Sequence, residues 1–287
     1  MGSSRTEGRA FPAVLLVLLG VLILACYFSM LRITAEFILF GEDMAHGVFA
    51  PLVALYLAWE RRDALLNPPG KPSFWSLPAL GIAGFIAVVA TLANSSTFSR
   101  FASLISLAGC IMLIGGWKAL QQFILPLSLL LFTFPVPAVL YGEVTQPLQL
   151  LATRLSEWCF ESLGFSVFRE GNILQLAHMQ LSVVEACSGL RSLITLFFFC
   201  LVYATFFEPA RWMRILVTLT AVPAAILVNT VRITATGVLG KFNPEWTKGL
   251  YHSFLGWAVF FVGFLLVVLI HRVIRKFSVV AASEMGA

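Results

Sequence analysis

Three side chains that could take part in covalent catalysis stand at the edges of long apolar runs. Cys187 lies within VVEACSGLRSL, Arg232 ends the motif NTVR, and His252 lies within YHSFLGW. The thiolate form of a cysteine is the nucleophile, and a nearby cation or the positive end of a helix lowers the thiol pKa toward the physiological range. A cysteine beside an arginine therefore indicates nucleophilic chemistry, provided that the fold brings the two side chains together.

The composition indicates a protein that is dissolved in lipid. Of the 287 residues, 59% are hydrophobic and only 11% are charged, whereas a soluble domain carries about 25% charged residues. The mean hydropathy is +0.92. The formal net charge of +5 comes from Lys and Arg beside apolar runs, as anchoring and orientation in a membrane require. Nucleic acid is therefore a poor explanation of this charge, and membrane lipid is the expected partner.

Eight apolar runs are candidate transmembrane helices, because a bilayer core of about 30 Å takes about 20 helical residues. The second run is short and contains Pro51, so its length alone also allows a re-entrant segment. Eight spans with an internal N-terminus place most Lys and Arg in the cytoplasm, which favours the full span and cytoplasmic termini. The first run lacks a cleavage pattern and is predicted to remain as a span. The runs are 11–31, 46–60, 74–93, 101–117, 119–140, 187–207, 213–232 and 252–270.

One longer segment on the outer side, roughly 141–186, interrupts the apolar runs. Its first half predicts an amphipathic helix lying on the membrane, since apolar residues recur there at helical spacing against charged ones. No internal repeat or linker is visible, so we expect residues 1–287 to form one all-α polytopic membrane domain that carries this insertion. The apolar positions of the amphipathic helix are Leu148, Leu151, Leu155, Trp158 and Cys159.

The second half of the insertion predicts a small β-hairpin. Leu174 and Leu176, then Leu181 and Val183, alternate with polar residues around a turn near residues 177–178. Such an alternation is typical of half-buried strands. The hairpin would lead directly into the segment that contains the cysteine.

The predicted topology brings Cys187, Arg232 and His252 to one level of the membrane. The sixth run starts on the outer side with the cysteine, the seventh returns outward to the arginine, and the eighth starts with the histidine. Arg191 follows Cys187 by four residues, so we expect it on the same helix face, and Asn229 extends the polar face of Arg232 by one turn. An arginine in or near hydrocarbon is costly and needs a partner or a task. Further supporting candidates are Glu185, Ser188, Gly189 and His46.

Each of these residues also has a purely structural interpretation. Cys187 could be a packing residue at a helix start, Arg232 an interfacial anchor, and His252 an ordinary interfacial residue. Glu185 could simply cap a helix, and Asn229 could bond a neighbouring helix. The separate residues are therefore weak indicators, and only their combination is informative.

The other cysteines and histidines indicate no metal or redox site. The five cysteines form no CxxC pair and have no zinc-like spacing with histidine. Cys26, Cys110 and Cys200 lie inside apolar runs, where a thiol behaves as a small hydrophobe. His178 falls on the predicted hairpin turn and His271 at the cytoplasmic end of the eighth run. No phosphate-binding glycine loop is visible, so we expect neither a metal nor a cofactor.

Taken together, these motifs resemble the exosortase/archaeosortase family. ACSGLRS, NTVR and a late YHSFLGW occur in the order of that family, on helices of matching orientation. Two further stretches agree with the family: HGVFAPLVALYLAW near the start, and the segment from FPVPAVLYGEV to GNILQL before the cysteine. The resemblance covers most of the chain, from residue 40 or so to about residue 260.

The resemblance implies a multispanning cysteine transpeptidase of the bacterial inner membrane, with its active site on the periplasmic side. Its substrates would be exported proteins that end in a Pro-Glu-Pro-like motif, one transmembrane helix and a basic end. Carried over to this chain, the nucleophile is Cys187, the arginine that stabilises the oxyanion is Arg232, and the general acid and base is His252. Charge complementarity makes Arg191 or Arg169 the candidate partner of the substrate glutamate.

Two other functions remain open from the sequence. Eight spans with intramembrane arginines could form a transporter for an anionic solute, although transporter sites tend to lie near the midplane and in repeated halves. This chain places its polar residues at one face and shows no repeat. An inactive scaffold that only holds sorted proteins is the second alternative, and the presence of all three reactive residue types argues against it. The acyl acceptor and the oligomeric state are not predicted.

Overall fold

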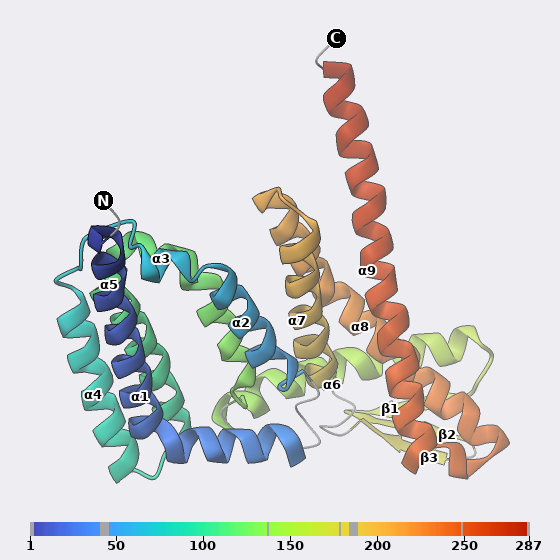
Figure 1. The fold of residues 1–287 in the computed structure, drawn as a ribbon. Coiled ribbons are helices and arrows are strands. Elements are labelled where there is room, and N and C mark those ends of the chain that lie inside the picture. The colour runs from blue at the N-terminus through green and yellow to red at the C-terminus, as the bar shows by residue number, and fades with distance from the viewer. Residues whose placement is uncertain are drawn as a thin grey trace. The chain divides into compact units, whose positions relative to one another are not determined.

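Helices make up nearly all of the chain in the computed structural model, which describes residues 3–40, 46–136, 138–177, 179–183, 189–247 and 249–285. The predicted all-α class is confirmed for these residues, with one small sheet. The chain divides into two compact units, Met1–Pro135 and Val136–Ala287, whose elements are labelled in Figure 1. The functional candidates of the seventh and eighth apolar runs belong to the second unit.

The hydropathy of the helices confirms a multi-pass membrane protein. Among the described residues, five helical segments are long and apolar enough to cross a membrane. The predicted runs at 46–60 and 74–93 form apolar helices that are shorter than this. The count of eight spans and the cytoplasmic termini therefore stay predictions. The five long segments are Val14–Leu39, Ser96–Thr133, Leu190–Phe207, Arg211–Phe242 and Gly249–Phe277.

The first unit contains a reversal of direction inside the second of its two long helices. Gly116 has φ +66° and is not helical, so it divides α5 into two arms (Figure 1). A Cβ at Gly116 would collide with the carbonyl oxygen of Lys71, and a positive φ is strained for any residue with a side chain. The arms correspond to the predicted runs 101–117 and 119–140, but the second ends in a 3-10 turn at Thr133, before Pro135. The unit comprises α1 (Ser3–Phe40), α2 (Phe49–Glu60), α3 (Asp63–Leu66), α4 (Ser76–Leu92), α5 (Ser96–Leu130) and η1 (Leu131–Thr133).

Small residues let α4 and α5 pack closely. Ala83, Ala90 and Ala102 are fully enclosed or nearly so, and a Cβ at Gly109 of α5 would lie 2.9 Å from the side chain of Leu80 in α4. Close approach through small residues is the usual way in which membrane helices associate, because lipid provides no hydrophobic drive between them. The helices α4 and α5 of the first unit are thus held together mainly by close packing of their backbones.

The second unit joins a helical bundle to a small antiparallel sheet. Among its described residues, three strands pair in the order β1-β2-β3. The predicted hairpin is confirmed as β2 and β3, and Leu174, Leu176, Leu181 and Val183 are all buried, as their alternation predicted. The unit comprises α6 (Ala138–Ser162), β1 (Val167–Glu170), β2 (Ile173–Leu176), β3 (Met179–Ser182), α7 (Leu190–Phe207), α8 (Arg211–Phe242), η3 (Pro244–Thr247) and α9 (Gly249–Met285).

The strand β1 was not predicted. Its sequence VFRE ends in two charged residues, and it forms because Val167–Glu170 pairs with β2 across the two-residue turn at Gly171 and Asn172. The side chain of Arg169 then reaches Glu157 of α6, with Nε 2.7 Å from Oε2. An ion pair thus joins this strand to the neighbouring helix.

The helix α6 has two different faces, one toward the unit and one away from it. Ala152, Ser156 and Phe160 are buried, and Phe160 fits over Gly237 of α8, where a Cβ would have no room. Of the predicted membrane face, Trp158 is 66% exposed on the surface of the unit. Leu151 is also exposed, whereas Leu148, Leu155 and Cys159 are half-buried. An exposed tryptophan with leucines around it suits an interfacial helix, and membrane contact of this face stays a prediction.

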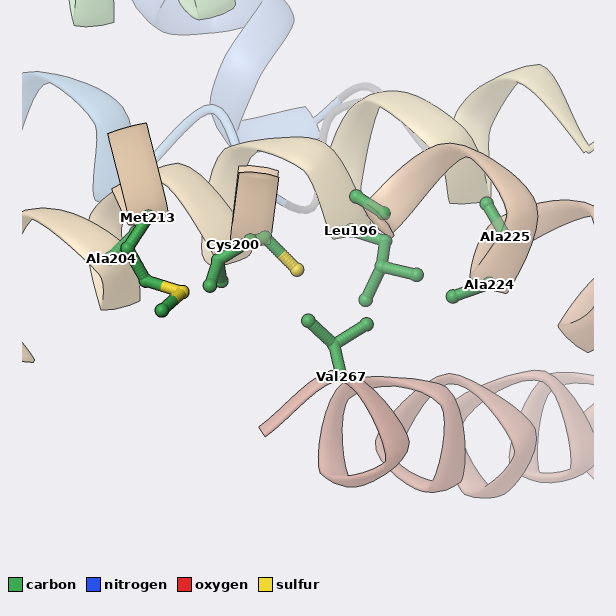
Figure 2. Packing of buried hydrophobic residues seen from close by; sticks show 9 residues of the cluster. Leu196, Cys200, Ala204, Met213, Ala224, Ala225 and Val267 are labelled. Atoms are coloured by element: carbon green, nitrogen blue, oxygen red, sulfur yellow. The ribbon is translucent and has the colours of Figure 1, made fainter. Parts of the chain in front are cut away.

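The helices α7, α8 and α9 form the core of the second unit, shown in Figure 2. Cys200 and Leu196 of α7 lie against Ala224 and Ala225 of α8, with Val267 of α9 closing the cluster. Cys200 is fully buried, which confirms its predicted role as a small hydrophobe. This packing fixes the three helices that carry the candidate functional residues.

Candidate active site

The helix α8 is long enough to cross a membrane and to extend beyond it. Its 32 residues correspond to about 48 Å at 1.5 Å per residue, against about 30 Å for a hydrocarbon core. Arg232 follows Arg211 by 21 positions, which places it about 31 Å along the helix axis. If Arg211 marks the inner boundary, Arg232 lies at the outer boundary, and the last ten residues of the helix lie outside, where Gly237 and Gly240 receive α6 and the sheet.

Arg232 packs directly on the helix that carries His252. A Cβ added to Gly256 of α9 would lie 3.3 Å from Cζ, 3.4 Å from Nη2 and 3.5 Å from Nε of Arg232. Because the three distances are nearly equal, the face of the guanidinium is turned toward the backbone of α9. Gly256 is one helical turn after His252, whose backbone belongs to α9.

Asn229, one turn before Arg232, packs on the start of α7. A Cβ at Gly189 would lie 3.0 Å from Nδ2 and 3.1 Å from Cγ of Asn229, and Asn229 is only 2% exposed. Gly189 has φ +84°, a left-handed conformation, and α7 begins after it at Leu190. The predicted helix start at residue 187 was therefore wrong.

The later start of α7 changes one expectation about the site. Cys187 precedes the left-handed residue Gly189, so the spacing of four residues to Arg191 does not place the two on one helix face. Arg191 lies in the first turn of α7 and is half-buried. The idea that the cysteine stands at the N-terminal end of this helix stays as a prediction.

Several candidates lie outside the described residues. These are Cys187 with its neighbours Glu185 and Ser188, the turn residue His178, and the side chain of His252. Two described glycines lie close to them in sequence: Gly189, two residues after Cys187, contacts Asn229, and Gly256, four residues after His252, contacts Arg232. The arrangement that can be described is therefore one helix, α8, whose polar face touches the start of α7 and the first turns of α9.

His46 has a local structural role in the first unit. Its carbonyl oxygen accepts hydrogen bonds from the backbone N–H groups of Phe49 and Ala50, both at 3.1 Å, and so begins α2. Its side chain is 2% exposed and its ring meets that of Phe132 edge-on, with the centroids 6.3 Å apart. These contacts do not require a catalytic role for this histidine.

A small apolar cavity lies beside Asn229. It has a volume of about 10 Å³, which is space for about one water molecule. Its walls come from three helices of the second unit, so α6 covers the place where Gly189 meets α8. The lining residues are Leu148, Leu151, Ala152, Gly189, Leu193, Ala225, Ile226 and Asn229.

Gly189 and Gly256 were the site residues whose steric role the sequence did not reveal. An isolated glycine in a helical pattern is nevertheless a recognised signal of close packing.

The opposite end of the bundle contains a second polar cluster. Tyr203 Oη lies 2.9 Å from His271 Nδ1, and His271 Nε2 lies 3.0 Å from Glu208 Oε2. His271 and Glu208 are 2% and 5% exposed. Burial alone would raise the pKa of the Glu208 carboxyl, but the N–H of Ala210, the hydrogen bond with His271 and the charge of Arg275 hold the pKa below its usual value. His271 thus belongs to this cluster, at the end of the bundle where the sequence placed it.

The described residues contain no group of three or more His, Cys, Asp or Glu side chains that could hold a metal ion.

A family model described as transmembrane exosortase matches residues 38–269 of the chain. The chain belongs to the exosortase family. Exosortases are known as a family of cysteine transpeptidases, associated with membranes and acting on proteins that bear sorting signals.

The family match covers most of this exosortase, from the end of α1 to just past the middle of α9. The matched region includes Cys187, Arg232 and His252. No curated protein and no solved structure matches the chain significantly. Membership of an enzyme family of this kind disfavours the transporter alternative.

Proposed function

We propose that this exosortase is a cysteine transpeptidase that cleaves C-terminal sorting tails from exported proteins at the periplasmic face of the bacterial inner membrane. The observation that supports the proposal most is the double contact of α8. Asn229 packs on Gly189, and Arg232 packs on Gly256. One helix therefore touches both segments that carry the proposed nucleophile and the proposed base.

Chain connectivity limits how far the proposed nucleophile and base can lie from these contacts. Cys187 is two peptide units from Gly189, and two units span at most about 7 Å. His252 lies four residues before Gly256 in α9, a rise of about 6 Å along the helix axis. Both distances are compatible with a single pocket around the guanidinium of Arg232.

The first chemical step is attack by the Cys187 thiolate. In the proposed pocket, the positive end of α7 and the cation of Arg232 favour the thiolate over the thiol. The sulfur forms a bond to the scissile carbonyl carbon, and the carbonyl π electrons move to oxygen. Arg232 stabilises this oxyanion, because a fixed guanidinium in a poorly hydrated site needs no reorganisation when the charge develops.

The second step breaks the carbon–nitrogen bond. His252 donates a proton to the departing amine, which leaves with the sorting tail, and the retained part of the substrate becomes a thioester on Cys187. An acceptor nucleophile then attacks the thioester, gives its proton to His252 and releases the thiolate. Cys187 acts as the nucleophile, and His252 acts as both acid and base. The proposed reaction therefore requires no cofactor.

The membrane itself positions the substrate in this proposal. A sorting tail that contains one transmembrane helix is held at a fixed depth, which leaves its scissile bond at the outer boundary. The length of α8 allows Arg232 to lie at this level. Such prior orientation raises the reaction rate, because enzyme and substrate then meet only in the plane of the membrane, with the scissile bond at the depth of the active site.

Recognition of the substrate glutamate is assigned to Arg191. Arg169, the other candidate, lies on β1 and pairs with Glu157 at 2.7 Å. Arg191 lies in the first turn of α7, two residues after Gly189, which packs on Asn229. The charge-swap test pairs Arg191→Glu with a substrate whose glutamate is changed to arginine. Restored processing supports the assignment, and unchanged processing of the original substrate by Arg191→Glu contradicts it.

The experiment for the proposed function compares two cysteine variants in cells that export a tail-bearing substrate. Cys187→Ala should abolish processing while the protein remains inserted at its normal level. Cys159→Ala is the matched control, because this half-buried thiol in α6 has no part in the mechanism. Normal cleavage by Cys187→Ala would refute the thiol mechanism. Binding of the substrate without any turnover by the wild-type protein would instead support the scaffold alternative.

A further inference from the structure

The small sheet of the second unit ends in the strand β3, whose outer edge is not paired. In the strand order β1-β2-β3, β3 has a neighbour on one side only. The N–H of Val183, just after β3, donates to the carbonyl oxygen of Asn172, just before β2, at 2.9 Å. Residues that bond to the partner strand alternate with residues that do not. Gln180 and Ser182 therefore direct their backbone N–H and C=O groups away from β2.

This edge is open, whereas the opposite edge of the sheet is covered. Among the described residues, no backbone group forms a hydrogen bond with the outer side of Gln180 or Ser182, and both residues are exposed. The strand β1 at the other edge packs against α6, where Arg169 pairs with Glu157. Proteins usually protect a free edge with a charge, a proline or a covering element. The sequence MQLS of β3 contains neither a charge nor a proline, so its edge is suited to pairing with another chain.

The strand β3 is seated on α8, the helix that carries Arg232. A Cβ at Gly240 of α8 would lie 2.5 Å from Sδ of Met179, the first residue of β3. Gly189, ten residues after Met179, contacts Asn229 of the same helix. Arg232 lies between Asn229 and Gly240 in α8. The start of β3 and the start of α7 thus lie at two levels of α8, on either side of the level of Arg232.

The end of β3 is fixed on the side of the proposed nucleophile. The side chain of Asn172 donates from Nδ2 to the carbonyl oxygen of Val183 at 3.1 Å, in addition to the backbone bond between the same two residues. Cys187 follows Val183 by four residues, which span at most about 14 Å. A peptide that is paired with β3 would therefore lie close to the proposed nucleophile and would be held by a rigid element.

We propose that the outer edge of β3 binds the sorting tail of the substrate in extended form, as an added strand. This inference rests on the proposed function, because it assigns the occupant of the edge from the nearness of Cys187. The N–H and C=O groups of Gln180 and Ser182 exchange hydrogen bonds with alternate residues of the peptide, as in other cases of strand addition. The segment ahead of the transmembrane helix of the tail is thereby held straight, and its scissile bond is presented to Cys187.

Pairing with β3 restricts the sequence of the peptide. In an added strand, every second residue directs its N–H toward β3, and the residues between direct theirs away. Proline has no N–H, so it fits only at the positions that face away. In a Pro-Glu-Pro-like motif both prolines occupy such positions when the glutamate bonds to β3. The proposal therefore assigns the backbone of the glutamate, and not that of the prolines, to the contact with the sheet.

The first test measures binding of a synthetic peptide by the purified full-length Cys187→Ala protein, which should bind the peptide without cleaving it. The peptide contains a Pro-Glu-Pro motif, an apolar helix and a basic end, and is methylated at one backbone nitrogen at a time. Methylation of the glutamate nitrogen, or of a nitrogen an even number of residues from it, should raise Kd about ten-fold. Methylation at the positions between should leave Kd unchanged. Binding in a side-chain pocket or as a helix would not give this alternation.

The second test obstructs the edge of β3 from the side of the protein. Gln180→Pro removes an outward N–H that β2 does not use, and its ring obstructs the incoming strand. We expect Kd for the peptide to rise about ten-fold at an unchanged Tm. Val167→Pro is the matched control, because the N–H of Val167 in β1 also points away from β2 but lies at the opposite edge. Its Kd should equal that of the parent protein.

The outcomes separate this proposal from the proposed function. Equal effects of methylation at every position, or an unchanged Kd for Gln180→Pro, would overturn pairing with β3. A dimer that Gln180→Pro converts to a monomer at unchanged Kd would show that the edge binds a second copy, and would overturn the proposal as well. Alternating effects of methylation on a peptide that the wild type never cleaves would contradict the transpeptidase and leave the pairing intact.

Discussion

The guanidinium of Arg232 faces the backbone of Gly256, and a Cβ at that glycine would lie 3.3 Å from Arg232 Cζ. Because Gly256 has no side chain, the guanidinium can lie against the backbone of α9, one helical turn from His252. In a transpeptidase this contact would align the cation that stabilises the oxyanion with the acid that protonates the leaving amine.

Gly256→Ala should therefore slow catalysis more than it lowers stability. The new methyl group would displace the guanidinium by a few tenths of an ångström, and we expect kcat for substrate processing to fall about ten-fold with little change in KM. Gly142→Ala is the control, because its Cβ would meet no atom within 4 Å. Processing at the wild-type rate by Gly256→Ala would contradict the alignment of Arg232 by this contact.

Gly189→Ala should reduce stability as well as activity. Its φ of +84° costs a residue with a side chain about 1–2 kcal/mol, and the methyl group would lie 3.0 Å from Asn229 Nδ2. Tm of the purified protein and processing of the substrate report the two effects. If Gly189→Ala leaves Tm unchanged, the left-handed start of α7 is wrong.

Gly116→Ala tests the reversal that separates the two arms of α5. The methyl group would collide with the carbonyl oxygen of Lys71, in a residue with φ +66°. We expect a loss of about 3 kcal/mol or more, from strain and overpacking together. The measurement is the yield of folded protein in detergent, with Gly84→Ala of α4, whose Cβ meets open space, as the control.

The lowered pKa of Glu208 predicts a dependence of stability on pH. A carboxyl whose pKa is lower in the folded protein contributes stability above its unfolded pKa of about 4.3, and this contribution is lost as pH falls through the folded value. Wild-type protein should lose more of its free energy of unfolding than Glu208→Gln does between about pH 5 and pH 3. Denaturant unfolding at several pH values checks this. Parallel curves for the two proteins would contradict the role given to Glu208.

The sequence predicted those parts of the fold that depend on local patterns. Hydropathy located the apolar helices, since a membrane helix must be apolar over most of its length. The alternation at Leu174, Leu176, Leu181 and Val183 located β2 and β3, because every second residue faces the core of the unit. Packing of Cys200 followed from its place inside an apolar run.

The features that the sequence did not predict depend on tertiary contacts. The strand β1 depends on its pairing with β2, and the ion pair of Arg169 with Glu157 joins it to α6. The start of α7 is set by the left-handed conformation of Gly189 against Asn229, whereas the sequence pattern extended the helix to Cys187. The order of Cys187, Arg232 and His252 was visible in the sequence, but the contact of Arg232 with Gly256 required the packing of α8 on α9.

The central claim is that Cys187 forms a thioester with the retained part of the substrate while Arg232 and His252 act beside it. Mass spectrometry of the protein after brief reaction with a tail-bearing peptide measures this directly. Digestion should yield a peptide with the acyl group on Cys187, cleavable by hydroxylamine, and Arg232→Gln should accumulate far less of it than the wild type. A cleaved substrate with no adduct on Cys187, or with the acyl group on Cys159, would contradict the account.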